Sequence, residues 1–326
     1  MRILIVKLSS LGDVVHTMPA VQDIRAALPH ASIDWVVEQS FAPLVRRCDG
    51  VQEVIGCELR RWRKSPLGAH TRSAWRTFTG ELRRRAYDAI IDLQGLTKSA
   101  LVSRAARLTA QGKRYAMGNQ TEGSSYEAPT RWVADVALAI APHVHAVTRS
   151  RELCASALGY EIVGPPRFGL LAGDHRVEPA DALPCVALVH GTSREDKCWP
   201  EAHWLDLGRR LIDHGLVVGL PHGDEAERAR AERIAASLGP QAQVWPRLDL
   251  GQLTDRLAAC DSVVGVDSGL SHIAVALDLP HVQIYNFDTA WRTGPILSQR
   301  QRSVFEQPAP SVESVWQALG EVRPLP

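Results

Sequence analysis

The stretch Ile3-Leu4-Ile5-Val6-Lys7-Leu8-Ser9-Ser10-Leu11-Gly12-Asp13, near the amino terminus, decides the fold. Its first four residues are all apolar and lack the polar alternation of a strand that has one face in water. Such a run is typical of a parallel-sheet strand that helices cover on both faces. A helical pattern follows from Val14 to Leu28 and ends at Pro29. The chain therefore opens as the strand, turn and helix of a doubly wound α/β sheet.

The same alternation of apolar runs and helical patterns recurs along the chain. Before residue 160 it predicts strands at 33–37 and 89–91 and a helix from Leu96 to about Arg107. Glycine, proline and charge between Tyr160 and Pro184 indicate a linker. The alternation then restarts, with strands predicted at 185–189, 216–220, 262–266 and 282–285 and helices at 202–213, 225–238, 250–260, 268–277 and 312–319. We expect two Rossmann-like, doubly wound α/β domains, residues 1–165 and 180–308, whose ligands lie in a cleft at the carboxyl ends of their strands.

Composition limits the class of protein. The 326 residues are 45% hydrophobic and 22% charged with a formal net charge of +1, which excludes disordered and collagen-like chains and gives no nucleic-acid signal. No apolar run reaches the 18 or so residues that a membrane span needs, and the first run is too short for a signal peptide. The six cysteines are scattered without a C-x-x-C pair, which favours reduced thiols and a cytoplasmic location.

The turn after the first strand carries the first candidate for chemistry, Asp13. A carboxylate at this position can be a general base that faces the cleft, or it can simply cap the following helix. The turn holds neither a G-x-G-x-x-G nor a G-x-x-x-x-G-K-[ST] pattern, which argues against dehydrogenases and P-loop nucleotidases.

Two loops of the second half form candidate anion sites. The loop after strand 185–189 offers the hydroxyls of Thr192 and Ser193 and the charge of Lys197, although a solvated loop would look similar. After strand 262–266, Asp267-Ser268-Gly269 opens a helix whose amides can bind phosphate. Asp267 and His272 are five residues apart, so a helix does not place them on one face; Asp267 or Ser268 as a plain cap, and His272 as a packed side chain, are the alternatives.

A basic segment lies between Glu58 and Arg85, with nine Lys and Arg against two Glu. At its centre Arg60, Arg61, Arg63 and Lys64 surround Trp62, a combination that suits phosphate-bearing or anionic-lipid partners. A merely solvated face is the alternative.

These motifs together resemble the ADP-heptose:lipopolysaccharide heptosyltransferases of glycosyltransferase family 9, and the type I enzymes most. The resemblance covers most of the chain and rests on the segments Arg2 to Ala20, Ile33 to Glu38, Arg60 to Lys64, Tyr87 to Leu96, Asp196 to Pro200 and Val266 to His272. It implies a GT-B fold, with residues 309–326 forming a helix that crosses back to the first domain. It also implies an inverting, metal-independent transfer of heptose from ADP-heptose to the first Kdo of the Kdo disaccharide on lipid A. No cofactor is expected, and no D-x-D metal motif is present.

The resemblance also implies roles for single residues. Asp13 matches the general base, and Lys197 matches the cation beside the diphosphate. Donor contacts fall on Thr192, Ser193, Ser268 and Gly269 for phosphate, Glu227 for ribose, Leu248 for adenine, and Asp267 and His272 for the heptose hydroxyls. Acceptor contacts fall on Arg60, Arg61, Arg63 and Lys64, which would also touch the anionic inner face of the inner membrane. The loop Tyr285 to Ala290 departs from the family pattern and is assigned no contact.

Two other functions stay open at this point. A type II enzyme would use the same donor with a heptose acceptor. A non-catalytic protein that binds nucleotides or anionic lipids could keep the same scaffold, although the presence of Asp13, Lys197 and Asp267 together argues against it.

Overall fold

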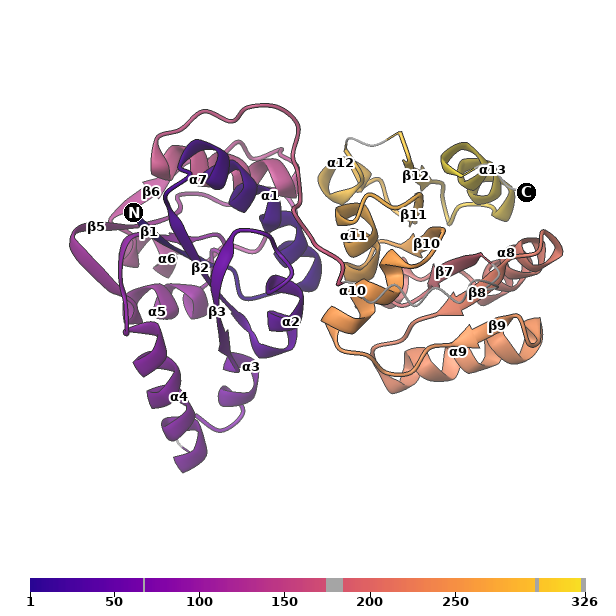
Figure 1. Ribbon diagram of the computed structural model, residues 1–326, viewed down its shortest axis with the longest axis horizontal. Helices are drawn as coiled ribbons and strands as arrows, with labels where there is room; N and C mark the ends of the chain where they lie inside the picture. Colours follow the sequence, from indigo (N-terminus) through magenta and orange to yellow (C-terminus); the bar gives the residue numbers. More distant parts are fainter. Residues whose placement is uncertain (67, 174–183, 297–298, 324–326) are drawn as a thin grey trace. The chain divides into compact units, whose positions relative to one another are not determined.

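Two sheets, each of six parallel strands, organise the chain (Figure 1). The computed structural model describes residues 1–66, 68–173, 184–296 and 299–323. It divides into two units, Met1–Leu170 and Leu171–Pro326. Both sheets have helices packed against them, as expected of the α/β class.

The first sheet has the strand order β3-β2-β1-β4-β5-β6. Its strands are β1 (Arg2–Val6), β2 (Ser32–Glu38), β3 (Val51–Cys57), β4 (Ala86–Asp92), β5 (Arg107–Met117) and β6 (Val136–Leu138). The central strand β1 pairs with both neighbours, Ile5 opposite Trp35 of β2 and Leu4 opposite Ile90 of β4. The four residues Ile3 to Val6 are completely buried, which explains why their sequence is apolar without alternation.

Seven α-helices and one 3-10 turn complete the described part of the first unit. They are α1 (Leu11–Ala27), η1 (Gln39–Phe41), α2 (Ala42–Val45), α3 (Leu59–Trp62), α4 (Ala69–Leu82), α5 (Thr97–Ala105), α6 (Pro129–Val133) and α7 (Ala146–Leu158). Helices α1 and α7 pack against each other, and an apolar core joins α3, α4 and α5 to β1, β2, β3 and β4.

The second sheet repeats the arrangement, in the order β12-β11-β10-β7-β8-β9. Its strands are β7 (Cys185–Val189), β8 (Val217–Leu220), β9 (Ala242–Val244), β10 (Ser262–Val266), β11 (His281–Tyr285) and β12 (Gln301–Phe305). Around them lie η2 (Glu195–Lys197), α8 (Glu201–Asp213), α9 (Glu225–Leu238), α10 (Leu250–Ala258), α11 (Gly269–Ala276), α12 (Ala290–Thr293) and α13 (Val312–Val322). Trp199, Trp204 and Leu207 fill the core between this sheet and its helices.

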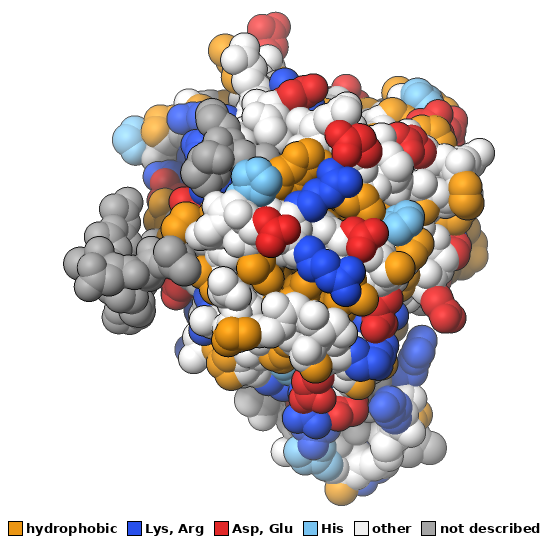
Figure 2. All heavy atoms as spheres, turned by 90° about the vertical axis from the view of Figure 1, so that its right-hand side faces the viewer, with side chains coloured by type: hydrophobic (Ala, Val, Ile, Leu, Met, Phe, Trp, Pro, Cys, Tyr) orange, Lys and Arg blue, Asp and Glu red, His pale blue; other side chains and the backbone are white. Residues whose placement is uncertain are grey.

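The outer face that carries α8 and α13 has acidic and basic side chains interspersed (Figure 2). Ion pairs such as Arg210–Glu313, at 2.8 Å, join the two helices across it. Exposed pairs of this kind contribute little to stability, so this face is ordinary solvated surface.

The strand order fixes where each unit can bind a ligand. In the first sheet the order reverses between β1 and β4, and in the second between β7 and β10. Loops that follow neighbouring strands diverge at such a reversal and leave a crevice at the carboxyl ends. We therefore expect functional residues on the loops after β1, β4, β7 and β10.

The predicted strands at the centres of both sheets are confirmed, whereas the peripheral ones escaped prediction. Strand β5 reads Arg-Leu-Thr-Ala-Gln-Gly-Lys-Arg-Tyr-Ala-Met and has only two buried residues, Ala116 and Met117, and β6 and β9 have three residues each. Because these strands lie at or next to a sheet edge, they do not need a continuous apolar run.

The first part of the expected linker belongs to the first unit, and the terminal helix belongs to the second. Residues 160–170 belong to the first unit, because Arg151 donates to the carbonyl of Gly164 and the Asp49 N–H donates to that of Gly169. Residues 174–183 of the linker lie outside the described part. Helix α13 packs its apolar face, including Val315 and Leu319, into the second unit's own core. The prediction that residues 309–326 cross back to the first domain stays a prediction.

Candidate functional site

The loop after β1 holds Asp13 by its carboxylate. Ser10 is the N-cap of α1, and Asp13 is the third residue of the first turn, so the prediction of Asp13 as the cap itself is corrected. Asp13 Oδ2 accepts hydrogen bonds from the Ser10 N–H at 3.1 Å and from Ser10 Oγ at 3.0 Å. This is the acidic half of a capping box. Ser10 therefore holds one oxygen of the carboxylate, and the side chain as a whole is partly exposed.

Two cations face the other oxygen of Asp13. Lys7 Nζ and an Arg149 guanidinium nitrogen each lie 3.7 Å from Oδ1. Burial acts to raise the pKa of Asp13, but the charges of Lys7 and Arg149 and the hydrogen bonds from Ser10 outweigh it and leave the pKa below its usual value. Burial lowers the pKa of Lys7, against the opposing charge of Asp13. Asp13 is thus ionised at neutral pH.

Sequence reasoning missed both cations. Lys7 directly follows the apolar run of β1, at the switch point. A lysine at the end of a buried strand is the signal by which the sequence could have pointed to it. Arg149 comes from α7, more than 130 residues away in sequence, and nothing local marks it.

The loop after β4 fastens the Asp13 loop. Gln94 Oε1 accepts from the N–H groups of Leu8 at 3.1 Å and Ser9 at 3.0 Å. Asp92, at the end of β4, accepts from the N–H groups of Gln94 and Gly95 and from Ser99 Oγ at 2.8 Å. Burial raises the pKa of Asp92 to about 6 in spite of these hydrogen bonds. The two loops at the switch point are therefore one hydrogen-bonded structure.

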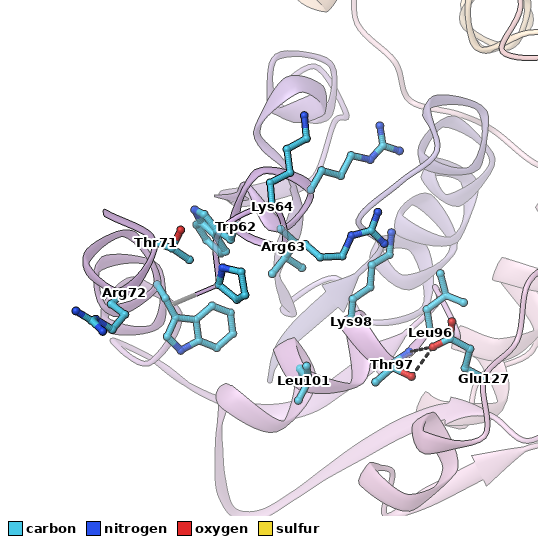
Figure 3. Close-up of a pocket in the computed structure, with 14 residues that line it drawn as sticks. Trp62, Arg63, Lys64, Thr71, Arg72, Leu96, Thr97, Lys98, Leu101 and Glu127 are labelled. Atoms are coloured by element: carbon cyan, nitrogen blue, oxygen red, sulfur yellow. Dashed lines mark hydrogen bonds between the residues drawn. The ribbon is translucent and has the colours of Figure 1, made fainter. Parts of the chain in front are cut away.

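The basic segment borders a cavity of about 950 Å³ in the first unit (Figure 3). Arg63 and Lys98 extend in the same direction in this view, and Thr97 is joined to Glu127. The cavity is lined by Leu59, Arg60, Trp62, Arg63, Lys64, Pro66, Thr71, Arg72, Trp75, Leu96, Thr97, Lys98, Leu101 and Glu127. It thus combines an apolar, aromatic lining with five cations and one carboxylate.

Only some residues of the predicted basic cluster line the cavity. Arg60, Arg63 and Lys64 line the cavity, whereas Arg61 does not and pairs with Glu58 at 3.3 Å. Trp62 is buried against the rings of Trp75 and Phe78, at centroid distances of 5.8 and 5.6 Å. Its apolar ring therefore anchors α3 to the core besides facing the cavity.

In the second unit, Asp267 is the centre of the polar groups at the switch point. Lys197 Nζ donates to Asp267 Oδ2 at 2.5 Å, and His272 Nε2 lies 3.4 Å from Oδ1. Burial acts to raise the pKa of Asp267, but His272 and Lys197 together hold it far below its usual value. The loop position of Asp267 brings it back onto His272 in the first turn of α11, although five residues separate them.

The hydroxyls predicted to bind phosphate come from the loops after β7 and β10. Thr192 Oγ1 donates to the Asp267 carbonyl at 3.1 Å. Ser268 is the N-cap of α11, and its Oγ is buried without a hydrogen-bond partner among the described residues. Gly269 begins the helix, and Ser193 is exposed on the loop after β7. The hydrogen bond from Thr192 therefore joins the loop after β7 to the residue that precedes Ser268.

Glu227 and Leu248 come from the loops and helices that follow β8 and β9. Glu227 Oε2 accepts from the Gly223 N–H at 2.6 Å. Its carboxylate fills the space beside Gly191, where an added Cβ would lie 2.2 Å from Oε1, so a larger residue there would displace the Glu227 carboxylate. Leu248 is half-buried just before Asp249, the N-cap of α10.

The loop after β11, to which the sequence analysis assigned no contact, has a structural role. Asn286 Nδ2 donates to the carbonyls of Asp196 at 3.0 Å and Cys198 at 2.9 Å, on both sides of Lys197. Thr293 Oγ1 lies 3.5 Å from Asp267 Oδ1. The divergent loop therefore positions the Lys197 turn.

The described residues contain neither a metal-binding cluster nor a membrane-spanning helix. No group of three or more His, Cys, Asp and Glu side chains is placed to hold a metal ion. No described helix has both the length and the hydrophobicity that crossing a bilayer requires.

Two units that each hold a doubly wound parallel sheet match the GT-B architecture of glycosyltransferases. A model of the family described as glycosyltransferase family 9 (heptosyltransferase) matches residues 75–317. The chain belongs to glycosyltransferase family 9, and it is an enzyme.

Similar proteins indicate which kind of heptosyltransferase within the family this chain resembles. Lipopolysaccharide heptosyltransferase 1 of Pseudomonas aeruginosa is 40% identical over 288 residues, covering 87% of this chain and 78% of that protein. The solved structure of E. coli heptosyltransferase WaaC with ADP superimposes with a TM-score of 0.87 at 34% identity, covering 99% of this chain and 100% of that one. Heptosyltransferase 2 of E. coli is 28% identical over 321 residues, 93% of this chain and 88% of that protein. The comparison favours heptosyltransferase 1 over heptosyltransferase 2.

The raised pKa of Asp92 predicts a pH dependence of stability that Asp92→Asn removes. Below about pH 4 Asp92 carries its proton in both states. Between about pH 4 and 6 the unfolded chain releases this proton while the folded chain keeps it, so the free energy of unfolding falls as pH rises; above about 6 the loss is complete. The difference in unfolding free energy between the native protein and Asp92→Asn should fall across this window in denaturant titrations.

Asp88 on the same strand is the matched control. The Arg2 N–H and Thr109 lower the pKa of Asp88, so its contribution to stability is lost as pH falls through the acid range, and the sign is opposite. Parallel pH curves for the native protein and Asp92→Asn would contradict the prediction.

Proposed function

We propose that this protein transfers heptose from ADP-heptose, with inversion and without a metal ion, to the first Kdo of a Kdo-disaccharide lipid A. The proposal is supported by the heptosyltransferase 1 relatives and by WaaC, whose solved structures include one with ADP and one with ADP-2-deoxy-2-fluoro heptose. The observation that carries it is the pair of switch points, one with an ionised carboxylate near two cations and one with a cation beside a helix amino terminus.

In the proposed step, Asp13 takes the proton of an acceptor hydroxyl. The hydroxyl oxygen bonds to the anomeric carbon on the face opposite ADP, the bond from that carbon to the diphosphate breaks, and ADP leaves with the electron pair. Lys197 and the amides at the start of α11 stabilise the charge that grows on the β-phosphate. Lys197 gives one N–H to Asp267, and an ammonium group has three, so pairing with Asp267 is compatible with binding phosphate.

The second unit would hold the donor along the loops that end its strands. Thr192, Ser193, Ser268 and Gly269 would contact the diphosphate, and the buried, unpartnered Ser268 Oγ supports this because such a hydroxyl gains a partner on binding. Glu227 would accept from the ribose hydroxyls, and the Leu248 backbone would meet adenine. Asp267 and His272 would orient the heptose hydroxyls.

Replacing the proposed base tests the reaction. Asp13→Ala should fold, bind ADP and lose about 10²- to 10⁴-fold in kcat, because general base catalysis contributes that much. The measurement is ADP release from ADP-heptose with Kdo-lipid A, with an acceptor that ends in heptose, and with no acceptor, each with and without EDTA.

Asp23, also on α1 and paired with Arg151, is the control, and Asp23→Asn should keep turnover within a few-fold. Near-normal turnover by Asp13→Ala would remove Asp13 from the mechanism. Preference for a heptose acceptor would overturn the acceptor assignment, and loss of activity in EDTA would overturn the metal-free step.

Lys197 should act on the donor through its charge. Lys197→Met should reduce kcat by about 10²- to 10³-fold, the usual cost of one group that stabilises transition-state charge. Arg194, in the same loop, pairs instead with Asp196 and is exposed, so Arg194→Met should retain turnover. Steady-state kinetics at saturating acceptor make the comparison, and equal losses in the two variants would contradict the role of Lys197.

We propose the cavity of the first unit as the acceptor site. Its cations Arg60, Arg63 and Lys64 suit phosphate or carboxylate groups, and its aromatic and aliphatic lining suits the apolar parts of a glycolipid. Two exposed apolar residues lie on this side, Leu101 of the cavity lining at 58% on α5 and Trp132 at 80% on α6, and these two helices pack together. We propose that this side makes peripheral contact with an anionic membrane surface.

Arg61 and Arg63 form a matched pair for the acceptor site. Arg63→Met should raise the acceptor KM about tenfold or more, because a charge-assisted hydrogen bond contributes about 1.5–3 kcal/mol. Arg61→Met should change it little, since Arg61 pairs with Glu58 away from the cavity lining. Acceptor titrations at fixed ADP-heptose measure both, and an equal effect of the two substitutions would argue against the cavity as the site.

A further inference from the structure

The two oxygens of the Asp13 carboxylate have different surroundings. Oδ2 is fixed by two hydrogen bonds from Ser10. Oδ1 has Lys7 Nζ and an Arg149 nitrogen at 3.7 Å each, beyond the distance of a hydrogen bond. Both cations therefore lie within ion-pair distance of Oδ1 and act on it through their charge.

Both cations are held in place by other partners. Lys7 is buried, and its Nζ donates to the Leu93 carbonyl at 2.9 Å, in the loop after β4. The Arg149 side chain is 7% exposed, and it donates to Thr121 Oγ1 at 3.1 Å. Neither charge can swing away into solvent, so both stay near Asp13 at a fixed separation.

Other ionisable groups on the neighbouring elements complete the surroundings. Asp92 ends β4 near Lys7, and Lys98 on α5 donates to Ser9 Oγ at 3.2 Å. His16, one turn along α1, packs its ring edge-on against His145 at the start of α7. Of these, Lys7 and Arg149 are the charges that contact the Asp13 carboxylate directly.

We propose that Lys7 and Arg149 are positioning residues of the transfer reaction, whose fixed charges keep Asp13 ionised while a negatively charged acceptor is bound. This inference rests on the proposed function, in which Asp13 is the base. An acceptor that carries phosphates and carboxylates brings negative charge to the site, which would promote protonation of a lone carboxylate. Two buried cations oppose this effect and keep the base in its active form.

The experiment is the pH profile of kcat/KM for Lys7→Met and Arg149→Met. Each substitution removes a charge about 4 Å from the carboxylate, and such a charge lowers a carboxyl pKa by about 1–3 units. The acid limb of the profile should therefore move to higher pH by about one unit or more. Arg149→Lys keeps the charge and should leave the limb near its original position.

Arg151→Met is the matched control. Arg151 lies two residues further along α7, is 8% exposed, and pairs with Asp23 of α1 at 2.7 Å. Its loss breaks an α1–α7 ion pair of the same kind but away from Asp13. Stability should fall in thermal unfolding while the acid limb stays in place.

The outcomes separate this inference from the proposed function. Loss of turnover at all pH values without movement of the limb would show a purely structural role for Lys7 and Arg149 and overturn the inference. If Lys7→Met does not fold, Arg149→Met and Arg149→Lys decide the question between them. Normal turnover by Asp13→Ala would instead overturn the proposed function itself.

Discussion

The reversal of strand order in each sheet is the constraint on which the rest of the molecule depends. All strands are parallel, so their carboxyl ends share one edge, and the reversal separates the loops after β1 and β4 and those after β7 and β10. Every charged group argued to take part in chemistry, apart from those in the acceptor cavity, lies on or against these loops. The buried apolar strands serve this purpose because they hold the loop ends at fixed separations.

Both switch points solve the same electrostatic problem in different ways. A carboxylate removed from water must be compensated by nearby charge. At Asp267 the compensation is close, since Lys197 donates directly to the carboxylate and His272 lies beside it. At Asp13 the compensation comes from hydrogen bonds of Ser10 to one oxygen and from two cations, each 3.7 Å from the other oxygen. The first arrangement suits a group that orients a ligand, and the second suits a group that must accept a proton.

The divergent loop after β11 shows how a family pattern can change without loss of the site. Its Asn286 reaches the backbone on both sides of Lys197, and Thr293 beyond it approaches Asp267. Backbone carbonyls are present whatever the sequence, so a single amide side chain can hold the turn.

The sequence by itself determined the fold class, the central strands and most of the residues at the switch points, because continuous burial leaves an apolar run and the ends of such runs lie together in a parallel sheet. It could not reveal the edge strands, whose exposure permits a polar sequence, nor the separation of Arg61 from its neighbours. Only the tertiary structure brought Arg149 of α7 to Asp13 and Asn286 to the Lys197 turn. These contacts join segments that are about 90 residues or more apart, and packing between helices and loops, which leaves no local periodicity, decides them.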